Sequence, residues 1–164
     1  MAPVDTFLIT WYIIFAFTAM SFEPLYYFGC EWSITCPAGA SSRPLAAIGR
    51  VWSIYVTWDP LFHSPPLWLR VLCYMEVFVF GPLYGLTAYG LLWRKTWLPP
   101  LAYCFSGALI YSTIVYFLME VLENAPDTNF LAVFLVNIPW TVIPIVLVSR
   151  MRGISQSSHN AKYE

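Results

Sequence analysis

The sequence predicts an all-α protein: a multi-pass membrane four-helix bundle with a ligand pocket inside the membrane. Of its 164 residues, 59% are hydrophobic and 19% are aromatic, but only 10% are charged, whereas soluble domains carry about a quarter charged residues. A bilayer core of about 30 Å requires about 20 apolar helical residues, and four stretches of the chain reach that length. Eight basic against nine acidic residues leave no basic surface for nucleic acid.

The four stretches are predicted to form one domain that ends in a short tail. The predicted spans are residues 7–28, 67–93, 99–122 and 130–149. The first has no basic start, follows Asp5 and is too long for a cleaved signal peptide, so we expect it to be retained. Residues 1–150 are therefore interpreted as a single transmembrane domain, and residues 151–164 as a polar, disordered cytoplasmic tail.

Local signals mark breaks within and between these stretches. Glu23 and Pro24 interrupt the first near its far end. A polar break at residues 94–96 separates the second from the third, which begins with two prolines at 99–100, and proline is favoured in the first turn of a helix. The fourth holds Asn137 and two prolines.

Lys and Arg are unevenly distributed between the two ends of the predicted bundle. With four spans, the end that holds both termini and the loop at Arg94 and Lys95 carries five basic residues, and the other end carries three, including Arg70 at its border. Short cytoplasmic loops are enriched in Lys and Arg. The distribution therefore predicts that both termini are cytoplasmic.

The first loop, residues 29–66, is too long for a tight hairpin. Its second half, residues 48–58, carries aromatic and aliphatic side chains at near-helical spacing, which predicts a helix that lies in the membrane interface or caps the bundle. Cys30 and Cys36 fall on the predicted lumenal side, where they either form a disulfide or stay free. No Cys/His spacing indicates a metal site.

Ionisable and polar side chains inside a span are costly, so they are candidate functional residues. At a rise of about 1.5 Å per residue, Glu23 lies roughly 24 Å from the cytoplasmic entrance of its span and Glu76 roughly 14 Å from the opposite entrance. The same estimate places further polar residues in the lumenal half or at mid-membrane. The residues expected to converge on one acidic pocket are Glu23, Glu76, Asp59, Tyr111, Tyr116 and Asn137.

Several of these residues also have structural interpretations. Glu76 could be protonated and bonded to nearby backbone, or paired with Arg70. Asn137 could join two helices, as amides do in membrane bundles. Asp59, which precedes Pro60, could cap and break a helix.

Carboxyls grouped in a low-dielectric pocket suit proton-transfer chemistry. One carboxylic acid that stays protonated can donate a proton, and an ionised partner can accept one. Neighbouring Trp and Tyr rings can stabilise a transient cation. The same set suits a lipophilic amine, because an ammonium group resembles a carbocation. Glu120 and Glu123, at the lumenal end of the third span, are expected to be solvated and not catalytic.

Three longer motifs carry a resemblance to a known family. Residues 54–83 read IYVTWDPLFHSPPLWLRVLCYMEVFVFGPL, residues 110–120 read IYSTIVYFLME, and residues 134–144 read FLVNIPWTVIP. In this order they resemble the EXPERA family, which comprises the emopamil-binding protein (a sterol Δ8–Δ7 isomerase), the sigma-2 receptor and related multi-pass proteins. The first motif looks like the sigma-2 receptor, and the other two are more similar to the isomerase.

The resemblance implies a bundle with a bowl-shaped sterol pocket in the membrane of the endoplasmic reticulum. In the isomerase, acidic residues that match Glu23 and Glu76, and an Asn that matches Asn137, contribute to that pocket. Two positions depart from the family pattern. The His that helps to shuttle the proton is replaced by Ala19, and an Asp expected in the third span is replaced by Thr113. The isomerase also has an additional span.

Two functions from different classes follow from these observations. The first is an isomerase or cyclase that acts on a sterol, terpenoid or other polyunsaturated lipid by protonation and deprotonation, without cofactor or metal. Its predicted catalytic residues are Glu76, Glu23 and Asp59. Its predicted substrate-binding residues are Asn137, Trp140, Tyr111, Tyr116 and Thr113. The second is a non-catalytic regulator of lipid trafficking that binds sterols or cationic amphiphiles. Expected partners are the bilayer, a lipid-like small molecule and, since many small bundles dimerise, a second copy.

Overall fold

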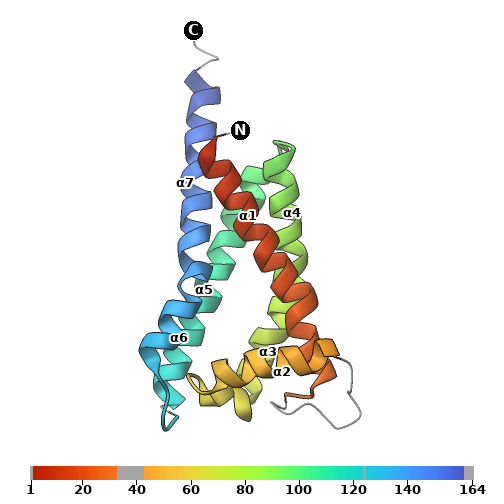
Figure 1. The fold of residues 1–164 in the computed structure, drawn as a ribbon. Helices are drawn as coiled ribbons and strands as arrows, with labels where there is room; N and C mark the ends of the chain where they lie inside the picture. Colours follow the sequence, from red (N-terminus) through yellow and green to blue (C-terminus); the bar gives the residue numbers. More distant parts are fainter. Residues whose placement is uncertain (1, 33–42, 124, 161–164) are drawn as a thin grey trace.

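The fold is an all-helical bundle, as predicted. The structure is a computed structural model that describes residues 2–32, 43–123 and 125–160, and this part of the chain holds no strand. Four helical segments are long and apolar enough to cross a membrane: Pro3–Gly29, Leu67–Leu92, Leu98–Glu123 and Phe130–Gly153. Both termini lie at the same end of the bundle (Figure 1). The predicted spans are therefore confirmed to within four residues at each boundary.

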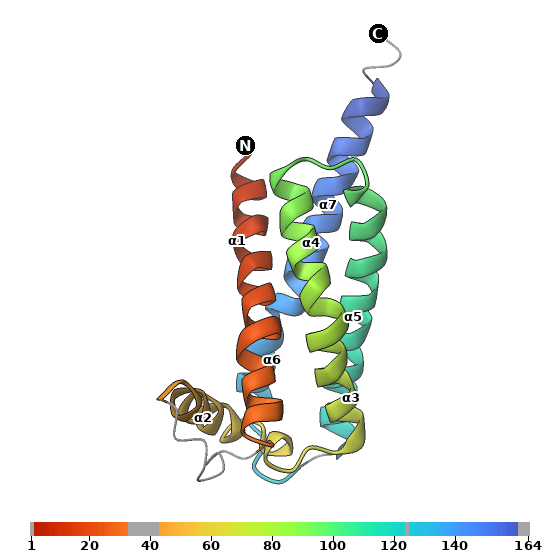
Figure 2. The same ribbon diagram turned by 90° about the vertical axis from the view of Figure 1, so that its right-hand side faces the viewer.

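The four spans form two packed pairs. Helix α1 (Pro3–Phe17) packs along α4 (Gly81–Leu92), and α5 (Leu98–Glu123) packs along α7 (Pro139–Asn160). Further contacts of α1 with α7 and of α4 with α5 close the bundle, and Figure 2 shows these helices standing side by side. The two pairs lie close together at the end with the termini and separate toward the other end, called here the loop end (Figure 1).

Two clusters of buried side chains hold the bundle together. The cluster near the termini includes Leu8, Tyr12, Phe15, Tyr84, Phe105, Leu109 and Leu147. The cluster at the loop end is mostly aromatic and includes Tyr26, Tyr27, Trp32, Trp52, Phe62 and Tyr116. Large apolar side chains also cover the outside of the spans, among them Ile13, Phe17, Phe78, Leu86, Leu118 and Leu131. This exposed apolar surface suits contact with lipid tails, which cannot hydrogen-bond to polar groups.

The helix predicted in the first loop caps the loop end. Helix α2 (Arg43–Val56) runs across this end of the bundle (Figure 1). Its Trp52 ring stacks on Tyr26 at 4.5 Å between centroids and on Phe62 of the short helix η3 (Pro60–His63) at 5.4 Å. Stacked aromatic pairs add about 0.5–1.5 kcal/mol beyond the area that they bury, so they fix α2 over the bundle. The two alternatives for Cys30 and Cys36 depend on Cys36, which lies outside the described residues.

Two spans widen into π-helix at their acidic residues. The first span continues from α1 into η1 (Thr18–Phe22) and η2 (Leu25–Gly29), and the second runs from α3 (Leu67–Met75) through η4 (Glu76–Phe80) into α4. Single π turns inside α-helices occur frequently at functional sites. In this protein, Glu23 directly follows the π turn η1, and Glu76 is the first residue of the π turn η4.

Prolines explain two of these π turns. The Glu23 N–H donates to the carbonyl of Thr18, and the Gly81 N–H donates to the carbonyl of Glu76, in each case five residues back. The next residue in both helices is a proline. A proline has no N–H, and its ring clashes with the carbonyl four residues earlier. The turn before it therefore widens, and this gives a local reason for the position of each acid.

The fourth span is broken between α6 and α7. Helix α6 (Phe130–Asn137) starts at Asn129, whose side chain accepts a hydrogen bond from the Ala132 N–H at 3.1 Å. It ends at Asn137, and α7 begins two residues later at Pro139, where the lack of an N–H is tolerated. The break leaves the Asn137 side chain at a helix end that faces the loop-end cluster.

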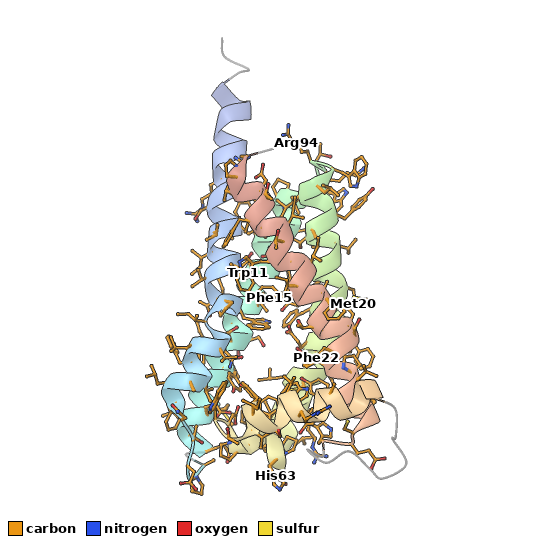
Figure 3. All side chains as sticks on the ribbon, in the orientation of Figure 1. Trp11, Phe15, Met20, Phe22, His63 and Arg94 are labelled. Atoms are coloured by element: carbon orange, nitrogen blue, oxygen red, sulfur yellow. The ribbon has the colours of Figure 1, made fainter. Side chains whose placement is uncertain are left out.

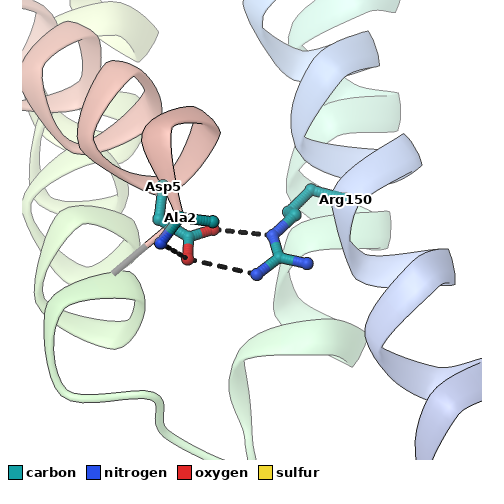
Figure 4. Close-up of polar contacts among 3 residues, drawn as sticks. All are labelled: Ala2, Asp5 and Arg150. Carbon is teal, nitrogen blue, oxygen red and sulfur yellow. Dashed lines mark hydrogen bonds and ion pairs between the residues drawn. The ribbon is translucent and has the colours of Figure 1, made fainter.

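The prediction of a disordered tail is wrong for residues 151–160, because α7 continues to Asn160. An ion pair anchors the start of this segment: the Arg150 guanidinium donates to both carboxylate oxygens of Asp5, at 2.6 and 3.1 Å (Figure 4). The next residue, Met151, is buried in the core. A helix that is fixed at this point propagates at little further cost, and the sequence alone did not indicate the pair.

Removing one partner of this ion pair should destabilise the bundle. In Arg150→Gln, the buried Asp5 carboxylate loses its charged donor, and we expect the free energy of unfolding to fall by about 1–2 kcal/mol, since the pair is only partly shielded from water. Thermal unfolding in lipid nanodiscs, followed by Trp fluorescence, measures the change. The double variant Asp5→Asn/Arg150→Gln should recover part of the loss. A single variant as stable as the unmodified protein would contradict the expectation.

Candidate functional site

A cavity lies between the two helix pairs, under α2. Its volume is about 280 Å³, close to the lower end of the range of about 300–1,000 Å³ for ligand pockets. The apolar side chains in its wall include Phe22, Trp52, Phe62, Leu69, Leu72 and Leu109. The polar side chains in its wall include Glu23, Tyr27, Tyr55, Glu76, Thr113, Tyr116 and Asn137. An apolar pocket with a few convergent polar groups is the arrangement expected of a ligand site.

Glu76 is held by donors from two other parts of the bundle. Its Oε1 accepts a hydrogen bond from the Tyr84 hydroxyl at 2.6 Å and another from the Trp140 indole N–H at 3.0 Å. Tyr84 lies two turns along the same span, and Trp140 belongs to the fourth span. The alternative pairing with Arg70 is wrong, because the guanidinium of Arg70 donates to the backbone carbonyl of Pro65 at 2.9 Å.

Glu23 faces the same cavity from the first span. Its Oε2 accepts a hydrogen bond from the hydroxyl of Tyr27, one turn later, at 3.1 Å. The π turn η1 that precedes Glu23 contacts the π turn η4 that begins with Glu76. Both carboxyls therefore reach one apolar space from adjacent, locally widened helices.

Trp140 joins the wall of the cavity to the buried core. Its ring stacks on Phe15, with 4.7 Å between centroids and an interplanar angle of 24°. Figure 3 shows Phe15 on the part of α1 that lies next to the fourth span. Stacking on Phe15 fixes the face of the Trp140 indole, and the hydrogen bond to Glu76 fixes its N–H edge. The indole ring is therefore held beside the Glu76 carboxylate.

A second polar group forms the floor of the cavity at the loop end. The Asp59 side chain is 0% exposed, and its Oδ2 accepts a hydrogen bond from the Tyr116 hydroxyl at 2.6 Å. The hydroxyls of Tyr55 and Tyr116 lie 3.1 Å apart. The Asn137 Nδ2 donates to the Tyr55 hydroxyl at 3.0 Å. These bonds tie α2, α5 and α6 together, so Asn137 both joins helices and lines the cavity.

Burial changes the acidity of this floor. It raises the pKa of the Asp59 carboxyl, and the hydrogen bonds from Tyr116, the Leu61 N–H and Tyr55 offset part of that shift. Burial, followed by the charge of Asp59, also raises the pKa of the Tyr55 phenol. The Leu61 N–H donates to Asp59 Oδ1 at 3.1 Å, so Asp59 caps the start of η3. Asp59 therefore acts as a helix cap, as one interpretation predicted, and also belongs to the hydrogen-bond network with Tyr55 and Tyr116.

The shifted pKa of Asp59 predicts a pH dependence of stability. Because its pKa is raised from 3.8, the folded protein holds this proton more tightly than the unfolded chain. The stability that Asp59 contributes is complete below about pH 4 and is lost as the pH rises through the folded-state pKa. We expect the melting temperature of Asp59→Asn to fall less between about pH 4 and about pH 7 than that of the unmodified protein. Thermal unfolding over this range measures it, and equal slopes would contradict the expectation.

The structure brings most of the predicted site residues together. Those that line the cavity are Glu23, Glu76, Asn137, Trp140, Tyr116 and Thr113. Asp59 lies behind the wall, bonded to Tyr55 and Tyr116. Tyr111 is not in the site: it is 71% exposed and lines an outer groove between the second and third spans. It lies two residues before Thr113, which turns its side chain about 200° around the helix from that of Thr113. The position of Tyr111 along the span gave its depth but not the side of the helix on which its side chain lies.

Several residues of the site were missed by the sequence reasoning. Tyr27 lies one turn after Glu23, so its spacing could have revealed it. Tyr84 and Tyr55 gave no such signal, because they meet Glu76 and Asn137 only in the folded bundle. The prediction that Glu120 is solvated is wrong, since the Glu120 side chain is buried.

Comparison with known proteins gives one match. A family model described as EXPERA, the expanded EBP superfamily, matches residues 44–151, which is about two thirds of the chain. Neither a curated protein nor a solved structure matches. The matched region runs from α2 into the fourth span and holds the floor of the cavity, Glu76 and Trp140. Because this match covers more than half of the chain, it shows that the chain belongs to the EXPERA superfamily.

Proposed function

We propose that this protein is an integral-membrane isomerase or cyclase that moves a proton onto and off an unsaturated, apolar lipid such as a sterol or terpenoid. The observation that carries the proposal is the pair of carboxyls in the wall of one apolar cavity: Glu23 directly follows the π turn η1, and Glu76 begins the adjacent π turn η4. Carboxyls are rare inside membrane spans and generally mark proton or substrate sites. The location that the family resemblance implies is the endoplasmic reticulum, and the distribution of Lys and Arg predicts that both termini face the cytoplasm.

The two carboxyls have different surroundings, which suggest different roles. Oε1 of Glu76 accepts two hydrogen bonds, an arrangement suited to a carboxylate that accepts a proton. Glu23 accepts one hydrogen bond from a phenol and is assigned as the acid. In the proposed step, Glu23 gives its proton to one carbon of a double bond, which leaves a positive charge on the other carbon. Glu76 then removes a proton from a third carbon bonded to that cationic carbon, and the electrons of the broken C–H bond form the new double bond. The product is an isomer of the substrate, and the protein ends with Glu23 ionised and Glu76 protonated.

Other residues of the wall support the intermediate of this reaction. Proton addition to a double bond produces a carbocation, which the face of an aromatic ring attracts. The fixed indole of Trp140 lies next to the Glu76 carboxylate, so that both can stabilise the same positive charge. Asn137, Tyr116 and Thr113 are assigned to binding the substrate, because they line the remaining polar part of the wall.

Lipid analysis of membranes that contain or lack the protein tests the proposal. Chromatography coupled to mass spectrometry should reveal a lipid that has the same mass as its precursor but a different retention time, and that accumulates only with the active protein. The isomer would also identify the substrate. A lipid that copurifies with the protein unchanged, with no isomer in the membranes, would reject the enzyme.

The alternative is a non-catalytic regulator of lipid trafficking that binds sterols or cationic amphiphiles. The observation in its favour is the combination of carboxylates with aromatic rings such as Trp52 and Phe22 in the cavity wall, since this combination binds ammonium groups as well as carbocations. Under this alternative, Glu76→Gln weakens the binding of a lipophilic amine, and no isomeric product forms in any variant.

A further inference from the structure

Glu120 is a buried acid whose carboxyl lies near the Tyr116 hydroxyl without a hydrogen bond of good geometry among the described residues. Its side chain is 1% exposed, and neither carboxyl oxygen has a partner among the described residues. Nearly all buried polar groups in native proteins are hydrogen-bonded, and an exception calls for a specific explanation. Nothing in the proton transfer between Glu23 and Glu76 uses this residue, so its burial needs a separate cause.

The surroundings of Glu120 place it between water and the floor of the cavity. It lies one turn after Tyr116 on α5, and its charged neighbours are Asp59 and Glu123. The phenol of Tyr55 is also within its electrostatic reach. Glu123 is exposed at the loop end and accepts a hydrogen bond from the Trp68 indole at 3.1 Å. Glu120 therefore has an exposed acid on one side and a fully buried acid on the other.

A continuous set of hydrogen bonds leads from Asp59 to the cavity. Asp59 accepts from Tyr116 at 2.6 Å, the Tyr116 and Tyr55 hydroxyls lie 3.1 Å apart, and Asn137 donates to Tyr55 at 3.0 Å. The last three residues line the cavity. Hydroxyl groups can accept one proton while they release another, so this network can carry a proton between the loop end and the cavity.

The proposed reaction can use such a connection. Each turnover leaves the acid without its proton and the base with one, and exchange with water through a proton path restores both groups before the next turnover. We propose that Glu120 is the residue through which protons pass between water at the loop end and the cavity. This inference rests on the proposed function, because that reaction is what the proton path would serve. The experiment that tests the path does not need the reaction to occur.

The transfer balances without any other reactant. Protonated Glu120 gives its proton to the Asp59 carboxylate, either directly or through the Tyr116 hydroxyl, which takes up one proton as it releases its own. The Glu120 carboxylate then recovers a proton from water at the loop end. Transfer in the opposite direction removes a proton from the cavity by the same residues, so neither direction changes the number of protons held by the protein at the end of a cycle.

Infrared spectroscopy of the whole protein in lipid nanodiscs tests this inference without a substrate. Transfer into D₂O shifts the carbonyl bands of protonated carboxyls as they exchange, and the difference spectrum of Glu23→Gln assigns the band of the protonated acid in the cavity. In Glu120→Gln we expect this band to exchange more slowly by about tenfold or more, because an amide cannot pass the acidic proton. Glu123 lies three residues after Glu120 and is exposed, so Glu123→Gln is the matched control. In this variant the proton of the cavity acid should exchange at the same rate as in the unmodified protein.

Two further variants separate a proton-transfer role from a structural one. Glu120→Asp keeps an acid and should retain most of the exchange rate. Glu120→Leu should fold with equal or higher thermal stability, because it removes a buried carboxyl that no partner stabilises, and it should exchange as slowly as Glu120→Gln. Unchanged exchange in Glu120→Gln or Glu120→Leu would overturn the inference.

The result is also distinguishable from a failure of the proposed function. The exchange is measured with water alone, so slow exchange in Glu120→Gln supports the path even if no lipid isomer is ever found. An enzyme that forms an isomer while Glu120→Gln exchanges normally would keep the proposed function and reject the path.

Discussion

Replacing Glu76 by Gln is expected to reduce formation of the isomeric lipid by about a thousandfold, within the range of about 10²–10⁴ that a positioned acid or base contributes. The amide keeps the shape of the side chain, and its oxygen can still accept from Tyr84 and Trp140, but it cannot take a proton from the substrate. The cavity and the bundle should therefore persist. Product formation in membranes, measured by chromatography and mass spectrometry per amount of folded protein, checks this result.

Two comparisons make the Glu76 result specific. Glu76→Asp keeps the carboxylate one methylene further from the cavity and should leave partial activity. Glu123→Gln removes an acid outside the cavity wall and should leave product formation unchanged. If Glu76→Gln forms product at a rate similar to that of the unmodified protein, Glu76 does not act as the base.

Replacing Trp140 by Leu is expected to lower product formation by about a hundredfold or more. The substitution removes a ring that contributes roughly 2 kcal/mol to a desolvated cation and a hydrogen bond to a charged group that contributes roughly 1.5–3 kcal/mol. Each 1.36 kcal/mol corresponds to about tenfold in rate. Product formation is measured as for Glu76.

Trp140→Phe separates the two contributions of the indole. It keeps an aromatic ring next to Phe15 but lacks the N–H that donates to Glu76, so we expect a smaller loss of about tenfold. Trp68 provides the matched control, since its indole also donates to a glutamate, Glu123, outside the cavity wall. Trp68→Leu should leave product formation unchanged. Equal losses in the Trp140 and Trp68 variants would indicate a general effect on folding and contradict the assigned role.

The π turns show how far local sequence can place a functional group. Glu23 comes directly before Pro24. Glu76 lies five residues before Gly81, which comes directly before Pro82. The distortion follows from the missing N–H and the ring of proline, so it depends only on neighbours in the chain. The position of both acids along their spans was also predictable, because the rise per residue of a helix is nearly constant.

Tyr111 and Glu120 show where that reasoning stops. The distance along a span does not give the direction of a side chain around it, and Tyr111 faces outward although its depth matches that of the site. Glu120 was expected to be solvated because it lies near the end of a span. It is buried because the end of the third span is packed against other elements, among them α3, and the chain positions of these elements do not reveal that contact.

The sequence by itself determined the class of protein, the four spans, the capping helix and the identity of the acids, because hydrophobic length, charge distribution and proline chemistry act locally along the chain. Only the tertiary structure decided which groups meet. Tyr84 and Trp140 converge on Glu76, Asn137 reaches Tyr55 across 82 positions, and Asp5 pairs with Arg150 across 145. Such contacts depend on how the helices are rotated and paired, and that is set by the packing of all the spans together.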